Sequence, residues 1–508
     1  MGMDYIVVQA GGKGTRLEYL TKNKPKALVP VDNLPMLFYL FRKYPDKRFV
    51  IIADYKKEVM REYLSSFADV KYQVVDASGA GTCGGVKQAI GLIPDHEPFM
   101  LVWSDLILPD YFMLPDEYEK NENPEHDYVG LSETFPCRWK YENGAFKEER
   151  SAKFGVAGFF LFTDKGRIKD VPESGELVRW ISGQGLSFRT IGLAGTKEFG
   201  LLEEYEKLPQ AKCRPFNRIS VDGSILIKEP IDSQGEKLAK REAAWYEKAS
   251  LLNIPELPKI YDTVPLKMEY INGRNIYDCN FDYETKKSIL VALVRALKSL
   301  HESERVNADS FSIEEAYFNK TMDRLSKIQD LIPFAKEREI VVNGRKCRNV
   351  YYHKRELQRK IEKLKTNCDQ FAFIHGDCTF SNLMIREDNS PVLIDPRGYF
   401  GFSELYGDVR YDWAKLYYSV VGNYDQFNLK KFRLIIGDTP EDGIKLSIDS
   451  NHWEDMEKDF FDMTSVDRDE IKLLHAIIWL SLTTYAWQDY DSICGAFYNG
   501  LYYLEEVL

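Results

Sequence analysis

Three polar residues at fixed spacing, in the stretch from residue 373 to 398, are candidates for phosphoryl-transfer chemistry. Asp377 follows a short apolar run, Asn382 comes five residues later, and Asp395 ends a second apolar run. Phosphoryl transfer from ATP requires an aspartate that orients the attacking hydroxyl and accepts its proton. It also requires an asparagine and a second aspartate that hold Mg²⁺. Four residues separate Asp377 from Asn382, which is the spacing of a kinase catalytic loop.

The elements around these residues are predicted to be strand, loop and strand, because two short apolar runs are bounded by Gly, Asn, Asp and Pro. The stretch reads FIHGDCTFSNLMIREDNSPVLIDPRG and resembles the catalytic and metal-binding core of the aminoglycoside phosphotransferase and choline kinase-like family. The resemblance implies a two-lobed, protein-kinase-like (α+β) domain. It makes Asp377 the base, Asn382 and Asp395 the Mg²⁺ ligands, and Arg397 a contact to phosphate or acceptor. The alternative is a pair of polar loops with ordinary caps and turns.

Two features upstream of this stretch fit an ATP-binding lobe. Lys228 ends a β-type run, and Glu242 lies fourteen residues later in a helical pattern. Kinases use a strand lysine paired with a helix glutamate to orient the ATP phosphates; a surface salt bridge is the alternative. The run at 266–271 resembles the hinge strand of the family, which implies that Met268 to Ile271 contact adenine through the backbone.

The N-terminal part of the chain opens with a β-type run at 5–8 that leads into the glycine-rich sequence GGKGTRL. A strand, a glycine-rich loop and a helix together form a phosphate-binding geometry. The sequence has neither the dinucleotide GxGxxG spacing nor the GxxxxGK[ST] spacing. Lys13 and Arg16 lie within the loop, where they suit a triphosphate.

The signature GGKGTRL, followed by LT and PKALVPV, resembles that of the sugar-1-phosphate nucleotidyltransferases. This resemblance implies a Rossmann-like α/β sandwich in which the loop holds the nucleoside triphosphate (NTP) through Gly11, Gly12, Gly14 and Thr15. Lys13 and Arg16 would contact the triphosphate, and Lys26 would contact the phosphate of the acceptor or of the NTP. Gly81 and Thr82 precede a predicted helix and would lie beside the base. The alternative for this last pair is a flexible loop with ordinary caps.

Asp105 follows the apolar run at 99–103. An aspartate at the carboxyl end of a central strand lies at the binding crevice of an open α/β sheet. By resemblance to the family it would hold Mg²⁺ against the NTP phosphates; a cap for the next turn is the alternative.

The acceptor half of this module is predicted from weaker similarities. Gly158 resembles the glycine of the strand beside the sugar, and Glu176 resembles an acceptor-binding glutamate at a helix start. The family has Asp-x-Gly-Thr in its closing strand, whereas this chain has Leu193 at the aspartate position. The departure leaves two-metal binding in doubt or places the second ligand elsewhere.

Length and composition limit the remaining possibilities. A chain of 508 residues predicts two or three domains, and we set the boundary so that residues 1–208 form the nucleotidyltransferase domain and 209–508 the kinase-like domain. We place its N-lobe at about 213–272 and its C-lobe at about 273–508. The net charge of −11 argues against nucleic-acid binding. The eight cysteines contain no CxxC pair and no apolar run is long enough to span a membrane, so we expect a cytoplasmic protein with reduced thiols.

Together these features predict a bifunctional enzyme. One module phosphorylates a small sugar, polyol or amino alcohol with ATP, and the other couples the resulting phosphomonoester to a nucleotide for a bacterial surface polysaccharide or lipid. CTP is the first choice of nucleotide, by analogy with choline-type kinases fused to cytidylyltransferases, while UTP and GTP are open. One alternative is a single active module with a regulatory partner, and another is a non-catalytic nucleotide sensor. The sequence identifies no acceptor and leaves a homo-oligomer open.

Overall fold

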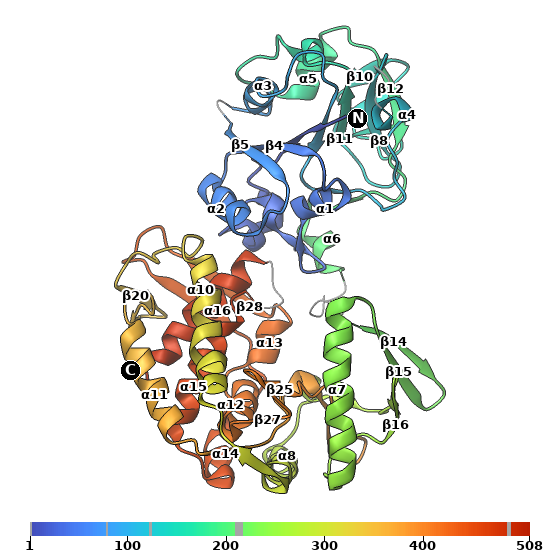
Figure 1. Cartoon of the computed structure of the whole chain (residues 1–508). Coiled ribbons are helices and arrows are strands. Elements are labelled where there is room, and N and C mark those ends of the chain that lie inside the picture. The colour runs from blue at the N-terminus through green and yellow to red at the C-terminus, as the bar shows by residue number, and fades with distance from the viewer. Residues whose placement is uncertain (1–2, 78–79, 121–123, 209–216, 485–488) are drawn as a thin grey trace. The chain divides into compact units, whose positions relative to one another are not determined.

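The computed structural model describes residues 3–77, 80–120, 124–208, 217–484 and 489–508. It divides into two compact units, one formed by Met1–Ala211 with Gln488–Asp491 and the other by Lys212–Trp487 with Ser492–Leu508 (Figure 1). The predicted boundary lies at the edge of residues 209–216, which are outside the described residues, so its exact position stays a prediction.

The first unit is built on a nine-stranded mixed sheet with the main order β10-β9-β11-β6-β1-β4-β5, while β8 pairs with β11 and β12. Its centre is parallel, because β1 pairs in parallel with both β6 and β4, and β4 with β5. The strands of the sheet are β1 (Tyr5–Gln9), β4 (Arg48–Ala53), β5 (Lys71–Asp76), β6 (Phe99–Trp103), β8 (Asp127–Ser132), β9 (Lys140–Glu142), β10 (Ala145–Lys147), β11 (Gly155–Phe162) and β12 (Phe188–Gly192).

Helices cover both faces of this sheet. On one face α1 (Met36–Lys43) packs Phe41 against Phe49 of β4, with ring centroids 4.7 Å apart. On the other face α3 (Cys83–Ile90) joins the core cluster that contains Val50 and Ile52 of the same strand. Phe49 and Val50 are neighbours whose side chains alternate between the faces, as strand geometry requires. This α/β arrangement confirms the predicted Rossmann-like sandwich.

The carboxyl ends of β1 and β6 meet at one edge of the sheet, where Gln9 pairs with Trp103. The glycine-rich loop after β1 and Asp105 after β6 therefore start side by side. The helix that we predicted after the loop is instead the kinked 3₁₀ helix η1 (Thr15–Thr21), in which Glu18 has the non-helical φ of 48°. Because η1 is short and kinked, we do not expect a helix dipole to contribute to phosphate binding at this loop.

The second unit begins with a four-stranded antiparallel sheet of order β14-β15-β17-β16, against which α7 (Ser233–Leu252) packs (Figure 1). The strands are β14 (Asn217–Asp222), β15 (Ile225–Pro230), β16 (Ile260–Thr263) and β17 (Leu266–Glu269). Strands followed by a helix at this position are those expected for the N-lobe of a kinase-like fold.

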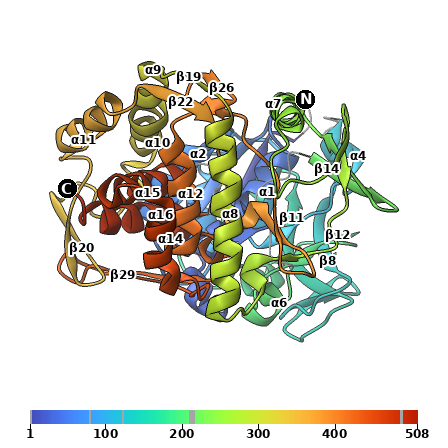
Figure 2. The same ribbon diagram turned by 90° about the horizontal axis from the view of Figure 1, so that it is seen from below.

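The rest of the second unit is mainly helical. In Figure 2, α8 (Tyr283–Ser303) lies beside α14 (Glu457–Thr464), and α14 beside α12 (Val409–Val420). The helix α12 also packs against α15 (Arg468–Leu482), and α16 (Tyr490–Leu504) completes the C-terminal end. None of the described helices is long and apolar enough to cross a membrane.

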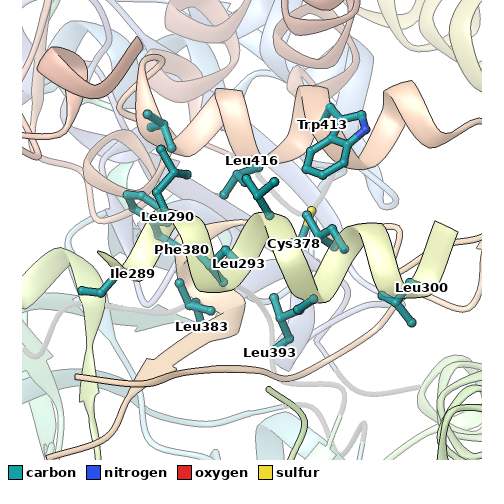
Figure 3. Packing of buried hydrophobic residues seen from close by; sticks show 14 of the residues in the cluster. Ile289, Leu290, Leu293, Leu300, Cys378, Phe380, Leu383, Leu393, Trp413 and Leu416 are labelled. Atoms are coloured by element: carbon teal, nitrogen blue, oxygen red, sulfur yellow. The ribbon is translucent and has the colours of Figure 1, made fainter. Parts of the chain in front are cut away.

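The apolar face of α8 supports the segment that carries Asp377. Leu293 and Leu300 are fully buried and belong to one core cluster with Cys378, Phe380 and Leu393 from that segment (Figure 3). The segment contains the predicted strands as β22 (Gln370–Phe373) and β24 (Pro391–Leu393), and a third strand, β23 (Leu383–Ile385), pairs with β24.

The segment 312–366 combines helices with a β-hairpin. It contains the π-helical turn η5 (Glu315–Asn319), α10 (Lys320–Ile328) and α11 (Lys354–Thr366). Between the helices lies a β-hairpin of β20 (Glu339–Val342) and β21 (Arg345–Arg348), which pairs with β29 (Ile444–Ile448). The hairpin turns at Asn343 and Gly344, which both have positive φ and therefore suit the twist of a two-residue hairpin.

Candidate active sites

The glycine-rich loop of the first unit passes close to Lys26 at Gly14, and Lys26 begins the short 3₁₀ helix η2 (Lys26–Leu28). Gly14 has φ 65°, and a Cβ atom there would lie only 3.0 Å from the Cβ of Lys26. Gly11 is equally constrained, because a Cβ atom would lie 2.9 Å from the Cβ of Asp54. Two of the predicted loop glycines are thus required for backbone packing, and one of them packs against a predicted phosphate-binding lysine.

The Lys26 ammonium forms an ion pair with Asp105 and lies 3.7 Å from a carboxylate oxygen of Glu198. Burial opposes ionisation of Asp105, but the Lys26 charge and hydrogen bond hold the pKa of Asp105 below its usual value. Burial and the Asp105 charge raise the pKa of Glu198, against the attraction of Lys26 and Arg16. The structure therefore brings together three predicted residues, Lys26, Asp105 and Arg16. It adds Glu198, which sequence reasoning missed.

Glu198 reaches this site through strand pairing that the sequence does not reveal. It lies on β13 (Lys197–Glu198), which pairs with β7 (Leu106–Ile107), and its register partner is Leu106, the residue after Asp105. Leu193, at the position where the resemblance predicts an aspartate, is fully buried. A second carboxylate is thus present beside Asp105, but it comes from five residues further along the chain.

The rest of the predicted nucleotide loop is accessible. Gly12, Lys13, Thr15 and Arg16 are exposed, and the Lys13 ammonium lies 5.4 Å from the ring centroid of Tyr55. Accessible backbone and cationic side chains can approach a triphosphate without displacing protein contacts.

Gly81 and Thr82 contact the two residues that flank Glu176. Gly81 has φ 93°, and a Cβ atom there would lie 2.2 Å from the carbonyl oxygen of Gly175. Thr82 donates its amide to the same oxygen at 2.8 Å, and its hydroxyl accepts a hydrogen bond from Leu177 N at 2.9 Å. Glu176, which we predicted to bind the acceptor, caps α5 (Leu177–Ser182) by accepting hydrogen bonds from two backbone amides.

Gly158 lies in β11 against the indole of Trp103. It has φ 78°, and a Cβ atom there would lie 2.5 Å from the ring. The strand register shifts between Val156 and Phe160, so Gly158 occupies an irregular position in β11. This packing explains the glycine without a sugar, and its predicted contact with the acceptor stays a prediction.

In the second unit, Lys228 of β15 joins the two carboxylates that an ATP-binding lysine is expected to contact. Its ammonium lies 2.8 Å from Glu242 of α7 and 2.6 Å from Asp395. Burial lowers the pKa of Lys228, but the charges of Asp395 and Glu242 outweigh it and raise that pKa. Lys228 therefore stays cationic between the two carboxylates.

The three residues of the predicted catalytic stretch lie together. The amide of Asn382 donates to the backbone carbonyl of Asp377 at 2.8 Å and to its carboxylate at 3.1 Å. The main chain before Asp395 is fixed by two hydrogen bonds, from Ile394 N to the Asn382 carbonyl at 3.0 Å and from His375 Nε2 to the Ile394 carbonyl at 3.1 Å. Asp395 itself has φ 55°, a conformation that costs energy in a non-glycine residue and is common at functional sites.

Sequence reasoning missed Lys415, which forms an ion pair with Asp377 at 2.9 Å from α12. Burial opposes ionisation of Asp377, but the charges of Lys415 and Arg397 lower the pKa of Asp377 to about 2. The carboxylate is therefore ionised at neutral pH and can accept a hydrogen bond from a hydroxyl group. A lysine that comes 38 residues after the aspartate carries no local sequence signal.

The remaining predicted residues are placed as follows. Arg397 lines a cavity beside Asp377 and donates to the hydroxyl of Tyr411 at 3.3 Å.

Met268 is buried within β17 and is paired with Leu226 and Ile260 on its two sides. Ile271 follows the end of β17 and is also buried. The predicted backbone contact with adenine at these two residues stays a prediction.

Both sites fit Mg²⁺ that is shared with a nucleotide. No group of three or more His, Cys, Asp and Glu side chains in the described part of the chain could hold a metal ion by itself. Mg²⁺ commonly takes only one or two protein carboxylates and completes its shell with phosphate oxygens and water. Asp105 with Glu198, and Asp395 with Asn382, offer such oxygen donors. Bound Mg²⁺ would neutralise phosphate charge.

The fold and these two clusters define a chain with two transferase domains. Residues 5–125 match the nucleotidyl transferase family model, and residues 227–431 match the phosphotransferase enzyme family model. The chain therefore carries a nucleotidyl transferase domain followed by a phosphotransferase-family domain.

Two proteins of similar sequence are named as nucleotidyltransferases. The UTP–glucose-1-phosphate uridylyltransferase AglF of Haloferax volcanii is 37% identical over 108 residues, which are 20% of this chain and 43% of that protein. The mannose-1-phosphate guanyltransferase of Yarrowia lipolytica is 32% identical over 142 residues, which are 26% of this chain and 39% of that protein. The chain thus spans less than half the length of these relatives. The crystal structure of HddC from Yersinia pseudotuberculosis is 20% identical with a TM-score of 0.34, covering 41% of this chain and 98% of that chain.

Proposed function

We propose that the protein is a bifunctional enzyme that phosphorylates a small hydroxyl compound with ATP and then couples the phosphomonoester to a nucleotide. The observation that carries this proposal is the presence of two separate anion-handling clusters in one chain, around Asp105 and around Asp377. The first reaction makes the type of compound that the second consumes. The acceptor class is a small sugar, polyol or amino alcohol.

In the first reaction, the acceptor hydroxyl oxygen attacks the γ-phosphorus of ATP while the bond to the β,γ-bridging oxygen breaks. ADP leaves, and the hydroxyl proton passes to the carboxylate of Asp377. Asn382 holds that carboxylate in place at 3.1 Å, and Lys228 between Glu242 and Asp395 is positioned for the ATP phosphates. Positioning and charge neutralisation are the main contributions that a protein makes to phosphoryl transfer.

In the second reaction, a phosphate oxygen of the phosphomonoester attacks the α-phosphorus of the NTP, and the bond to the α,β-bridging oxygen breaks. Pyrophosphate leaves, and the product is a nucleoside diphosphate derivative. Both reactants are anions, so cationic side chains must reduce their repulsion. Lys26 beside Asp105, and the exposed Lys13 and Arg16 of the glycine-rich loop, are placed to do so.

We propose CTP as the nucleotide, by analogy with choline-type kinases fused to cytidylyltransferases. UTP and GTP are the alternatives, because the relatives above are named as uridylyl- and guanyltransferases. We further propose that the reaction takes place in the cytoplasm and that the activated product supplies a surface polysaccharide or lipid. Nucleoside diphosphate derivatives are the activated form in which such building blocks are transferred.

One observation favours a single active module, namely the apolar Leu193 at the position of an expected metal ligand. Glu198 weakens that alternative, because it supplies a carboxylate next to Asp105 from another position. We therefore keep both modules active in the proposal.

The test is to incubate the protein with ATP, Mg²⁺, one of CTP, UTP or GTP, and a panel of sugars, polyols and amino alcohols. Formation of ADP and pyrophosphate together, dependent on the acceptor, is the expected result. Asp377→Ala should abolish ADP formation and leave turnover of NTP with added phosphomonoester intact. Asp105→Ala should do the converse.

Asp462→Ala and Asp46→Ala are matched controls, because both aspartates are exposed. Each should retain both reactions. ADP formation by the wild type without pyrophosphate release from any NTP and added phosphomonoester would favour a regulatory first module. ATP binding with no transfer to any acceptor would favour the nucleotide sensor.

A further inference from the structure

The cavity beside Asp377 is rich in basic side chains. It has a volume of about 50 Å³, and four basic side chains line it: Lys320, Arg324, Arg397 and Lys415. Asp377 is the single acidic side chain among the described residues of its lining. A binding site for a neutral or cationic hydroxyl compound does not require such an excess of positive charge.

Two of the four cations are close to the reacting carboxylate. Lys415 pairs with Asp377 at 2.9 Å, and the charge of Arg397 also acts on Asp377. These two are placed to neutralise the phosphoryl group during its transfer. Phosphoryl transfer therefore explains the presence of Lys415 and Arg397 in the lining. It does not explain the presence of Lys320 and Arg324.

Lys320 and Arg324 lie four residues apart on α10, so they lie on the same face of that helix. Arg324 donates to the carbonyl and hydroxyl oxygens of Ser481 on α15, at 2.6 and 3.0 Å. Lys320 has no hydrogen bond or ion pair to any described residue. Lys320 thus lines the cavity without a hydrogen-bond or ion-pair partner among the described residues.

The cost of this arrangement is visible at Lys320. Burial lowers the pKa of its ammonium well below the usual value, and the charges of Arg397, Arg324 and Lys415 lower it further, against a smaller opposing effect of Glu315. A lowered pKa favours the neutral amine, whereas an anion bound beside Lys320 would stabilise the protonated form.

The backbone before Lys320 is also unusual. The π-helical turn η5 ends at Asn319, and its residues Ala316 and Tyr317 line the cavity. Tyr317 is held by a hydrogen bond from its hydroxyl to Asp408 at 3.0 Å. π-helical turns are rare and occur frequently at functional sites, so the backbone gives support that is independent of the charges.

We infer that this cavity binds the acceptor and that the acceptor is itself an anion, with a carboxylate or phosphate held by Lys320 and Arg324 and a hydroxyl directed to Asp377. The inference rests on the proposed kinase function and narrows its substrate class. The inference excludes amino alcohols as acceptors, because an ammonium group would face the four basic side chains of the lining. Of the two kinds of anion, a carboxylate also suits the first domain. Phosphorylation of a hydroxy acid gives a product with a single phosphomonoester group, which is the group that the second reaction consumes.

The size of the cavity favours a small acceptor. A volume of about 50 Å³ exceeds the roughly 10–15 Å³ that one water molecule needs and lies well below the roughly 300–1,000 Å³ of pockets for drug-sized ligands. A hydroxy acid of a few carbon atoms is therefore a better fit than a hexose.

The first experiment compares acceptors that differ in charge, with ADP release as the measurement. Two matched pairs differ in charge, namely glycerate with glycerol and threonate with threitol. Glycerol 3-phosphate is added as a phosphate-bearing acceptor, and serinol as a cationic one. We expect kcat/KM for the anions to exceed that for the neutral partners by roughly 10- to 100-fold, as charged hydrogen bonds imply. Preference for glycerate or for glycerol 3-phosphate distinguishes a carboxylate from a phosphate. Equal or better use of glycerol or serinol would overturn the inference.

The second experiment tests the residues. Lys320→Met and the milder Lys320→Gln should raise KM for the anionic acceptor roughly 10- to 100-fold and leave KM for ATP unchanged. Lys327→Met is the matched control, because Lys327 is exposed on the same helix and does not line the cavity. Unchanged KM for the acceptor in both Lys320 variants would contradict the assignment.

Failure of the kinase reaction and failure of this inference are separable by calorimetry of the full chain. If no acceptor yields ADP, the proposed function fails. Glycerate or glycerol 3-phosphate that binds the wild type, and binds Lys320→Met at least about tenfold more weakly, still supports an anion site. Absence of binding by both anions, or equal binding of glycerol, overturns it.

Discussion

The Nζ atom of Lys228 lies 2.6 Å from the Oδ1 atom of Asp395, although 167 positions separate the two residues in the sequence. The same ammonium lies 2.8 Å from Glu242, so one cation connects the N-lobe strand, the N-lobe helix and the loop after β24. This is the arrangement in which a kinase lysine and its metal-binding aspartate both face the ATP phosphates. The described contacts therefore agree with a lobe arrangement suited to nucleotide binding.

Lys228→Met should lower kcat/KM for ATP by roughly 100-fold or more, because the phosphates lose a fixed cation. Nucleotidyl transfer from added phosphomonoester should be unchanged, and both rates can be measured on one preparation. Lys267→Met is the matched control, since Lys267 lies on β17 of the same sheet and is partly exposed. Wild-type ADP formation by Lys228→Met would show that this lysine does not bind ATP phosphates.

Glu198→Gln should weaken divalent-metal binding at the nucleotidyl transfer site, because it removes one of the two carboxylates beside Lys26. We expect the affinity for Mn²⁺, measured by electron paramagnetic resonance in the presence of a non-hydrolysable NTP, to fall roughly 10- to 100-fold. Glu203→Gln is the control, because Glu203 is exposed nearby in the sequence. An unchanged Mn²⁺ affinity would leave Glu198 with only a contact to Lys26.

The sequence predicted those parts of the sites that depend on local spacing. Asp377, Asn382 and Asp395 lie within nineteen residues and are held by hydrogen bonds between neighbouring turns and strands. Lys228 and Glu242 are fourteen residues apart and belong to a strand and the helix that follows it. In both cases a short chain segment limits where the side chains can lie.

The parts that sequence reasoning missed depend on long-range packing or on an ambiguous local signal. Glu198 reaches Asp105 only through pairing of β13 with β7. Lys320 and Arg324 lie on α10, whose many charged residues are typical of a solvent-exposed helix. Because α10 packs against α15, these two side chains instead line a cavity. The sequence Asn343–Gly344 is a strong hairpin signal, so the hairpin of β20 and β21 could have been predicted from the sequence.

Asp425 should give the folded protein a measurable pH dependence. It is fully buried and accepts a hydrogen bond from Ser381 of the catalytic loop, and burial raises the pKa of Asp425 to about 6 despite the bonds from Ser381 and Ser419. The folded state therefore binds this proton more tightly than the unfolded state. Its contribution to stability is present below about pH 4 and is lost as the pH rises through about 6.

Asp425→Asn removes that ionisation and keeps the size of the side chain. Relative to wild type, the free energy of unfolding in urea should shift in favour of the variant by on the order of 2 kcal/mol between pH 4 and pH 8. Asp462→Asn, an exposed change, should show no such difference. A difference between wild type and Asp425→Asn that does not vary with pH would mean that Asp425 stays ionised throughout.

Asp412 is the anchor of the catalytic loop, and its removal should separate the two activities. It is fully buried, and its carboxylate accepts hydrogen bonds from the backbone amides of His375 at 2.9 Å and Gly376 at 2.7 Å. His301, at the end of α8, lies 2.9 Å from the same carboxylate. Burial raises the pKa of Asp412, but the hydrogen bond and charge of His301 outweigh it and lower that pKa.

Asp412→Asn keeps the shape but places an amide donor where N–H groups already point, so at least one buried hydrogen bond must be lost. We expect unfolding of the kinase domain to become easier by about 1–3 kcal/mol and ADP formation to fall roughly 100-fold, because Asp377 follows Gly376 directly and loses its fixed position. Nucleotidyl transfer should be retained. His301→Gln should give a smaller loss, and a double-mutant cycle should show coupling because the two side chains are in contact. Additive effects in that cycle would mean that His301 only fills space at the end of α8, whereas coupling means that it fixes the carboxylate that holds the loop.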